Sequence, residues 1–279
     1  MTAASPPTAA SAPAPAGRTG TLGLALRQFD YWLTVYRRTW KGSAVSSFVM
    51  PLLYLTAMGV GLGGFIDDPD AIERLGGLTY LEYIAPGLLA ATVMQNAVFE
   101  STYPVMSGIK WNKVFVAMLN TPVVVPALLL ANFGYIAFRM TTIAGVFIVV
   151  TAVFGLVPSV WAGLLGLLVA VLIGLAHATP VVALSGRLEN DAGFAIVFRL
   201  GVMPMFLFSG AFFPVSQLPA VFEWLAYVTP LWHGVELTRM LTTGTLEAGM
   251  AAVHTGYLLL WLMTGWWLAI KTFSRRLVQ

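Results

Sequence analysis

The sequence predicts an all-α integral membrane protein with six transmembrane helices, an amphipathic N-terminal interface helix, and short re-entrant helices in the outer leaflet between spans five and six. Composition is the first reason, because 58% of the 279 residues are apolar and only 10% are charged, against about 25% in a soluble domain. So few charges leave too little polar surface for a water-exposed globule, and the mean hydropathy is +0.81. The second reason is a series of apolar runs of about 20 residues, the length that crosses a bilayer as a helix.

Residues 1–20 consist mostly of Ala, Pro, Ser, Thr and Gly. We expect a disordered cytoplasmic tail there, because the segment has no apolar periodicity and lacks the apolar core of a signal peptide. The transmembrane domain is then 21–279. Its first part, 21–43, interleaves aromatic residues with Arg27, Arg37 and other charges. That is too charged for a span and suits a helix lying in the headgroup region, with a short cytosolic helix as the alternative.

Six apolar runs follow that are long enough to cross the membrane. The third is taken to begin at Arg139, although 122–138 is also apolar, because an Arg at mid-bilayer costs about 2.5–3.5 kcal/mol on insertion scales. The expected spans are roughly 45–64, 83–106, 139–157, 160–183, 194–213 and 252–272.

The positions of Lys and Arg predict the orientation. With the N-terminus inside, all but Arg74 and Arg239 of the 15 lysines and arginines fall on the cytoplasmic side. Because cytoplasmic loops are enriched in Lys and Arg, we expect both termini in the cytoplasm. The absence of cysteines fits a multi-pass protein of the bacterial cytoplasmic (inner) membrane. The Asp-rich outer loop 65–82 is expected to be solvated.

The segment 214–243 is apolar but too polar for a seventh span. A span here would place four polar groups in hydrocarbon, namely Glu223, His233, Glu236 and Arg239. We therefore expect two short helices that enter the outer leaflet and return. Ser216 is the expected N-cap of the first and Thr229 that of the second, with Pro230 at its first position and Gly244 at its end.

One polar stripe runs along the second span. Thr92, Asn96, Glu100 and Tyr103 recur at helical spacing and must face protein or water rather than lipid. Two interpretations remain open. The stripe lines a candidate translocation path, or Glu100 forms a buried ion pair with Arg139 or Arg199.

The loop after the second span carries a short basic and aromatic cluster, Lys110, Trp111, Asn112 and Lys113, followed by an amphipathic stretch. Such a segment suits docking onto a cytosolic partner. The alternative is a membrane-anchoring loop whose lysines extend to the headgroups.

No catalytic, cofactor-binding or metal-binding residues are predicted in this chain. None of its lysines follows a glycine, so the GxxxxGK[ST] phosphate-binding loop is absent. There are no cysteines, and the three histidines, His177, His233 and His254, show no ligand spacing.

Three stretches carry a family resemblance: YLEYIAPGLLAATVMQNAVFESTY (80–103), WNKVFVAMLNTPV (111–123) and MFLFSGAFFPVSQLPAVFEWLAYVTPLWHGVELTR (205–239). They resemble the permease family of type-two ABC exporters and are most similar to its nodulation protein J branch. The resemblance runs from about residue 25 to 275.

The resemblance implies a homodimer of six-helix subunits with two copies of a separate ABC ATPase, which would hold the ATP and Mg. It also implies a coupling helix near 107–121 and re-entrant outer helices near 214–243. This subunit would not itself be catalytic. The implied substrate is amphiphilic, a lipid-linked oligosaccharide or other glycolipid, or a drug, and no nucleic acid is involved.

Two other functions were weighed. An ion-coupled secondary transporter commonly shows two repeated halves with broken helices, and no convincing repeat is present. An intramembrane serine protease would use Ser209, followed by Gly210, together with His254, but position 207 is Leu where such proteases usually carry Gly.

Overall fold

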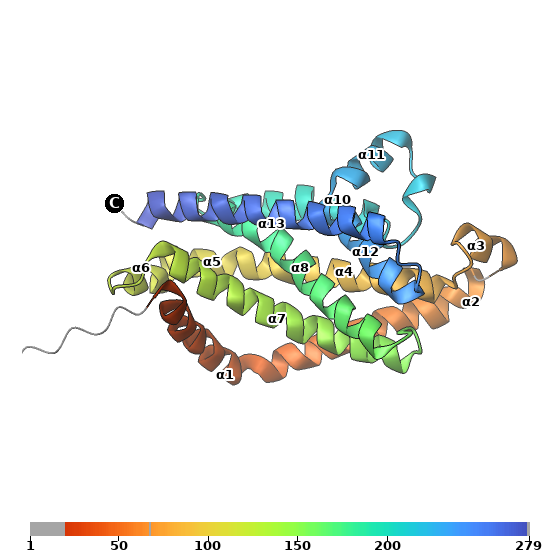
Figure 1. The fold of residues 1–279 in the computed structure, drawn as a ribbon, viewed down its shortest axis with the longest axis horizontal. Helices are drawn as coiled ribbons and strands as arrows, with labels where there is room; N and C mark the ends of the chain where they lie inside the picture. Colours follow the sequence, from red (N-terminus) through yellow and green to blue (C-terminus); the bar gives the residue numbers. More distant parts are fainter. Residues whose placement is uncertain (1–19, 67, 278–279) are drawn as a thin grey trace, which may run out of the picture.

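The computed structural model describes residues 20–66 and 68–277, so the expected tail lies outside the described residues except for Gly20. The regular structure of the described residues is entirely helical. Long helices lie roughly side by side in an elongated bundle, and short helices occupy both of its ends (Figure 1).

The expected interface helix and first span form one continuous helical segment. Helix α1 (Thr21–Leu55) runs through a π-helical stretch, η1 (Thr56–Leu62), into α2 (Gly63–Ile66). Figure 1 shows a bend within α1 that separates its first part from the part leading to α2. The short helix α3 (Pro69–Arg74) follows at the far end of the bundle, with the Asp68 carboxylate accepting a hydrogen bond from the Ala71 N–H at 2.7 Å.

The second predicted span is broken near its end. Helix α4 (Tyr80–Ser101) starts at a capping box formed by Thr79 and Glu82. It ends at Thr102, whose backbone is not helical, and α5 (Tyr103–Met106) follows with Pro104 in its first turn. The chain then forms the π-helical turn η2 (Ser107–Trp111) and α6 (Val114–Leu119).

The expected start of the third span was wrong for the helix. Helix α7 (Val125–Val153) begins well before Arg139, which lies near its middle. The sequence argument placed Arg139 at a helix end to keep its charge out of hydrocarbon. In the structure the Glu100 carboxylate of α4 forms an ion pair with Arg139. The arginine can therefore lie inside the helix rather than at its start. Helix α8 (Val160–Ser185) follows, capped by the Ser159 hydroxyl.

The C-terminal part alternates short and long helices. Helix α9 (Ala192–Ile196), η3 (Val197–Val202) and α10 (Met203–Phe208) form one helical run. A 3₁₀ turn, η4 (Val215–Gln217), precedes α11 (Ala220–Val228) and α12 (Pro230–Thr243), and α13 (Ala248–Leu277) ends the described chain.

Three of the four expected helix signals in this part are found. The Thr229 hydroxyl accepts from the Trp232 N–H, Pro230 is the first residue of α12, and Gly244 ends it at φ +71°. The expected cap Ser216 was wrong. It lies inside η4, and α11 begins only after Pro219, because Pro at the start of a helix loses no intrahelical bond.

Four helical segments of the described residues are long and apolar enough to cross a membrane: Phe48–Ile66, Val125–Val153, Val160–Ser185 and Ala248–Leu277. The run Ala192–Phe208 is apolar but shorter. Helix α4 has polar residues along its length and lies in the core, with most of its side chains buried. It packs against α7, α8 and α12.

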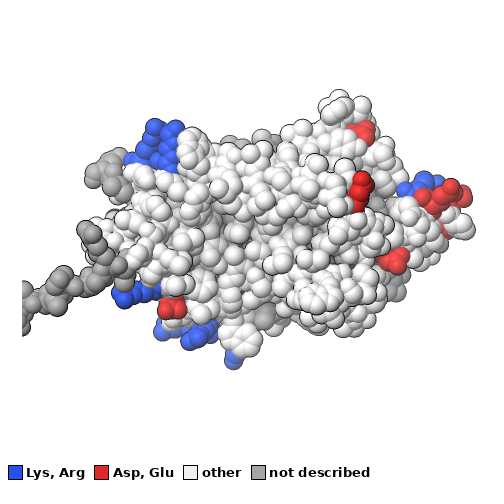
Figure 2. All heavy atoms as spheres, in the orientation of Figure 1, with Lys and Arg blue, Asp and Glu red and all other residues white. Residues whose placement is uncertain are grey.

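Charge is distributed unequally along the bundle. Figure 2 shows that Lys and Arg gather at the end where α1 begins and α13 ends, whereas Asp and Glu predominate at the opposite end, around α3. Both ends of the described chain lie at the basic end (Figure 1).

Candidate functional site

A groove of about 430 Å³ lies between the first apolar segment, α4 and the η3–α10 run. It combines two adjacent amides with aromatic and aliphatic side chains: Tyr54, Gln95, Asn96, Phe99, Phe198, Val202, Met203 and Phe206. Tyr54, Phe99 and Met203 are largely exposed, so the other described residues leave this face uncovered.

The predicted polar stripe is divided between two environments. Asn96 lines the groove, and its amide donates to the Thr92 carbonyl one turn earlier at 2.8 Å. Tyr103 lies beyond it, with its ring 5.1 Å from that of Phe194. Glu100 does not line the groove.

Glu100 instead faces Arg139. Its Oε1 lies 3.0 Å from Nε of Arg139, and the side chains are only 15% and 12% exposed. The guanidinium also lies over the Tyr36 ring, 5.1 Å from its centroid. This contact joins α1, α4 and α7. A buried ion pair packed against an aromatic ring fixes the positions of the helices that carry it. Arg199, the other cation considered for Glu100, is exposed on η3.

Gln95 was missed by the sequence analysis. Neighbouring residues on a helix point about 100° apart, so a strict stripe at spacings of three and four passes from Asn96 to Thr92 and omits residue 95. The available signal was the occurrence of two consecutive amides in the buried helix α4.

The predicted coupling segment is fastened to the rest of the basic end. The Lys110 ammonium donates to the Glu189 carbonyl in the loop after α8, and Asn112 donates to the Ser107 hydroxyl at 2.8 Å. Trp111 and Lys113 are exposed, and Lys113 has a left-handed backbone at φ 53°. This turn folds α6 back onto η2.

Phe115 anchors that fold. It is buried and packs so closely on Gly108 that a Cβ there would lie 3.0 Å from its ring. Its ring also contacts Trp32 of α1 and Phe273 of α13.

The predicted outer region contains a compact polar cluster. Arg239 of α12 pairs with Glu236, donates to the Gly210 carbonyl at 2.6 Å and lies 4.0 Å from the centroid of the Tyr83 ring. The Tyr83 hydroxyl donates to the same Gly210 carbonyl at 3.1 Å. The cluster therefore holds the turn after α10 against α4 and α12.

Histidines and an acid complete this region. Nδ1 of His233 lies 2.8 Å from Nδ1 of His254, so one ring donates and the other accepts. Glu223 accepts from the Tyr227 hydroxyl at 2.8 Å, and this hydrogen bond raises the pKa of Tyr227. Ser209 is buried and its hydroxyl makes no hydrogen bond to a described residue, so the Ser209–His254 pair of the protease alternative is not formed.

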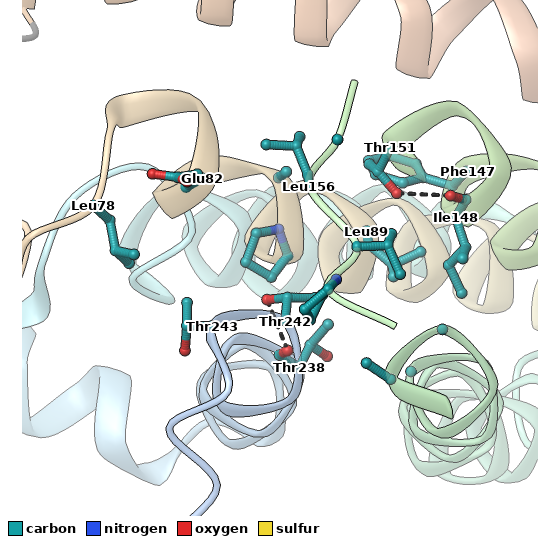
Figure 3. Close-up of a pocket in the computed structure, with 18 residues that line it drawn as sticks. Leu78, Glu82, Leu89, Phe147, Ile148, Thr151, Leu156, Thr238, Thr242 and Thr243 are labelled. Atoms are coloured by element: carbon teal, nitrogen blue, oxygen red, sulfur yellow. Dashed lines mark hydrogen bonds between the residues drawn. The ribbon is translucent and has the colours of Figure 1, made fainter. Parts of the chain in front are cut away.

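A second cavity, of about 210 Å³, lies at the acidic end between α4, α7, α8 and α12 (Figure 3). Its polar groups already have partners. The Thr151 hydroxyl donates to the Ile148 carbonyl at 2.9 Å and that of Thr242 to the Thr238 carbonyl at 3.2 Å, as the dashed lines in Figure 3 mark. Glu82 serves the α4 cap. The groove beside Asn96, with its paired amides and open face, is therefore the better candidate site.

The candidate site is thus a mixed polar and apolar groove on a helical bundle, one end of which is basic. A model of the ABC-2 type transporter family matches residues 28–242. The chain belongs to this family. It is a membrane-spanning permease subunit of an ABC exporter. Membership of this family argues against the alternative function, an ion-coupled secondary transporter.

Named relatives of this permease agree with the family. Nodulation protein J of Rhizobium leguminosarum bv. trifolii is 30% identical over 256 residues, which cover 89% of this chain and 94% of the relative. Nodulation protein J of Rhizobium meliloti (strain 1021) is 29% identical over 258 residues, covering 88% and 94%. The permease is thus close to the nodulation protein J branch. The family implies an ABC ATPase as its partner.

Proposed function

We propose that the permease exports an amphiphilic substrate across the bacterial cytoplasmic membrane, and that the groove beside Asn96 forms one wall of the path. A lipid-linked oligosaccharide or other glycolipid is the substrate class that fits best. Sugar hydroxyls suit the Gln95 and Asn96 amides and the flat aromatic rings, while a lipid chain suits Val202, Met203 and Phe206. A drug-like amphiphile has the same two-part chemistry and is the alternative.

The working unit is a homodimer with two separate ATPase subunits, each holding ATP and Mg. Each permease subunit crosses the membrane six times, through α1–α2, α4, α7, α8, α9–α10 and α13, with both termini in the cytoplasm. The exposed groove residues Tyr54, Phe99 and Met203 support this assembly, because two copies facing each other enclose a path shielded from lipid. The charge separation along the bundle (Figure 2) supports the orientation.

The segment 107–121 transmits the ATPase stroke. Its exposed residues Trp111 and Lys113 are available to a partner, whereas Lys110 and Phe115 are tied to the bundle. The helices α11 and α12 return from the outer leaflet and close the outer end.

The deciding observation is the pair of adjacent amides in the groove, and Asn96→Leu tests it. The variant removes a polar group of the wall at nearly constant volume, so the complex reconstituted in proteoliposomes is expected to keep its basal ATP hydrolysis and lose at least about tenfold in glycolipid transport. Leu168→Ala, on the exposed face of α8, is the control and should transport normally. Full transport by Asn96→Leu would remove the groove from the path.

A further inference from the structure

A third hollow lies at the basic end of the molecule and is separate from the groove. It measures about 520 Å³ and lies between the end of α13, the loop after α8 and the turn η2. Five cationic side chains line it with a single carboxylic acid: Lys110, Arg187, Lys271, Arg275, Arg276 and Glu189. Figure 2 shows Lys and Arg gathered at this end of the bundle.

The cations of this basic hollow have different duties. Arg276 donates from Nη1 to the Gly186 and Leu188 carbonyls at 2.9 and 2.8 Å, which satisfies the C-terminal end of α8. Lys110 is bonded to the Glu189 carbonyl. Arg187 and Lys271 are exposed, and Lys271 lies over the Trp267 ring, 4.9 Å from its centroid. Arg276 and Lys110 therefore build the hollow, while Lys271 and Arg187 present charge to it.

The surface of α13 that leads to this hollow is apolar. Leu260, Met263 and Trp267 are all exposed, and with Lys271 they recur at helical spacings of three and four, so they share one face. A tryptophan beside a lysine at the end of an apolar stripe is the pattern found at the boundary between hydrocarbon and headgroups. This pattern places the hollow at the depth of the lipid headgroups. The exposed apolar face of α13 leads to it and is suited to contact with an acyl chain.

We propose that the basic hollow binds the phosphate headgroup of an anionic diacyl phospholipid, with one acyl chain lying along the Leu260–Met263–Trp267 face of α13. The volume of the hollow is large enough for a phosphodiester group together with ordered water molecules. One water molecule takes about 30 Å³. With the proposed orientation the lipid belongs to the inner leaflet. Because Lys110 belongs to the coupling segment, the bound lipid bridges η2 and α13 at the place where the ATPase acts.

The apolar stripe distinguishes this ligand from others of the same charge. Inorganic phosphate has no apolar part, so the exposed apolar face of α13 would not add to its binding affinity. An acidic protein surface would need a flat contact area rather than a hollow beside an apolar helix. A phospholipid uses both parts. The same logic governs basic pockets between transmembrane helices that take anionic lipid headgroups.

Native mass spectrometry of the purified full-length permease tests the proposal, with palmitoyl-oleoyl phosphatidylglycerol and the matched phosphatidylcholine as probes. The wild type should retain phosphatidylglycerol in preference to phosphatidylcholine. K271Q/R187Q should bind phosphatidylglycerol about tenfold more weakly, whereas K271R/R187K should bind it normally. R37Q/R38Q is the matched control, because it removes two exposed cations of α1 that do not line the hollow, and its affinity should not change.

Four results would overturn the proposal. Equal retention of phosphatidylglycerol by K271Q/R187Q would exclude the site, and equal loss in R37Q/R38Q would reduce the effect to general charge. Displacement of the lipid by inorganic phosphate at comparable concentration would make it a free-anion site. Loss of ATPase co-purification in K271Q/R187Q with lipid binding unchanged would make it a protein-docking surface.

A measurement on the unmodified protein keeps the test independent of variant folding. Phosphatidylglycerol with a photoreactive group in its acyl chain should label α13 between Leu260 and Trp267, and labelling confined to other helices would contradict the proposal. Both experiments are made in detergent and require no transport, so their failure is separate from a failure of the export proposal.

Discussion

Glu100 and Arg139 show how a single pair of side chains decides the shape of a helix. An arginine alone in the middle of an apolar helix is costly, and the expected third span was placed so as to avoid that cost. In the structure the guanidinium instead pairs with the Glu100 carboxylate of α4 and lies over the ring of Tyr36. The pair is nearly dry, so its contribution lies in registering α4 against α7 rather than in net stability.

Glu100→Gln is expected to destabilise the purified permease, because it leaves the Arg139 guanidinium without its counter-charge, a change that typically costs about 3–5 kcal/mol when one partner of a buried pair is removed. The measurement is the melting temperature in detergent. Adding Arg139→Met should recover part of the loss, because the buried cation is then removed together with the carboxylate. Glu247→Gln, at an exposed carboxylate, serves as control. An unchanged melting temperature for Glu100→Gln would show that the buried Arg139 does not depend on this carboxylate.

Single residues at helix ends were the easiest part of the site to predict. Thr229, Pro230 and Gly244 sit where their local chemistry requires. Glu100 was recognised as unusual because its charge has no place in lipid, although sequence alone could not choose between Arg139 and Arg199. Gln95 and the phenylalanines of η3–α10 were not found, since a groove depends on which helix faces meet, and no local pattern records that.

At the scale of elements, the segment 107–119 is built from two short helical pieces and a strained turn. Lys113 adopts a left-handed backbone that only a few non-glycine residues take. Phe115 then packs into the space that Gly108 leaves. The segment is therefore held on its inner side and exposed on its outer side, which suits a mechanical contact.

Reversing the charges with K110E/K113E is expected to weaken substrate-stimulated ATP hydrolysis severalfold in the reconstituted complex, because the variant disrupts both the link to the loop after α8 and the exposed docking surface. Folding is checked by gel filtration and melting temperature. Lys41→Glu, which reverses an exposed charge on α1, should leave stimulation unchanged. Normal stimulation in K110E/K113E would return this loop to the role of a membrane anchor.

Element boundaries depended on neighbours that a linear sequence does not reveal. The run of helix from α1 into α2 is continuous because nothing between Arg38 and Val45 forbids helix, even though polarity changes there. Helix α4 was recognisable by its length, yet its break at Thr102 arises from an irregular backbone and the following Pro104. Composition indicated that the chain is helical, local capping residues marked some helix ends, and contacts with neighbouring helices decided the others.

At the scale of the whole molecule, the distribution of charge and the position of both described ends give the bundle a polarity (Figures 1 and 2). The permease contains no native cysteine, so single cysteines report on topology without background. Cys at Asp70, in α3, should react with a membrane-impermeant thiol reagent added to intact cells. Cys at Arg187, in the loop after α8, should react only after the membrane is opened.

Both positions are exposed in the structure, so a lack of reaction is not explained by burial within the protomer. External labelling at Arg187 together with protection at Asp70 would invert the proposed orientation. It would also place the basic hollow in the opposite leaflet.

The end of α8 holds one more consequence. Arg276 of α13 binds the last carbonyls of α8 and the loop after it, Lys110 of η2 binds the same loop at Glu189, and the Phe273 ring presses on Gly186 so closely that a Cβ there would lie 2.8 Å away. Three helices that are remote in sequence, η2, α8 and α13, are thus held together at one closely packed contact. If the short helices η2 and α6 contact the ATPase as proposed, we expect a displacement of these helices to move the adjoining ends of α8 and α13 together. The opposite ends of both helices would then shift at the same time.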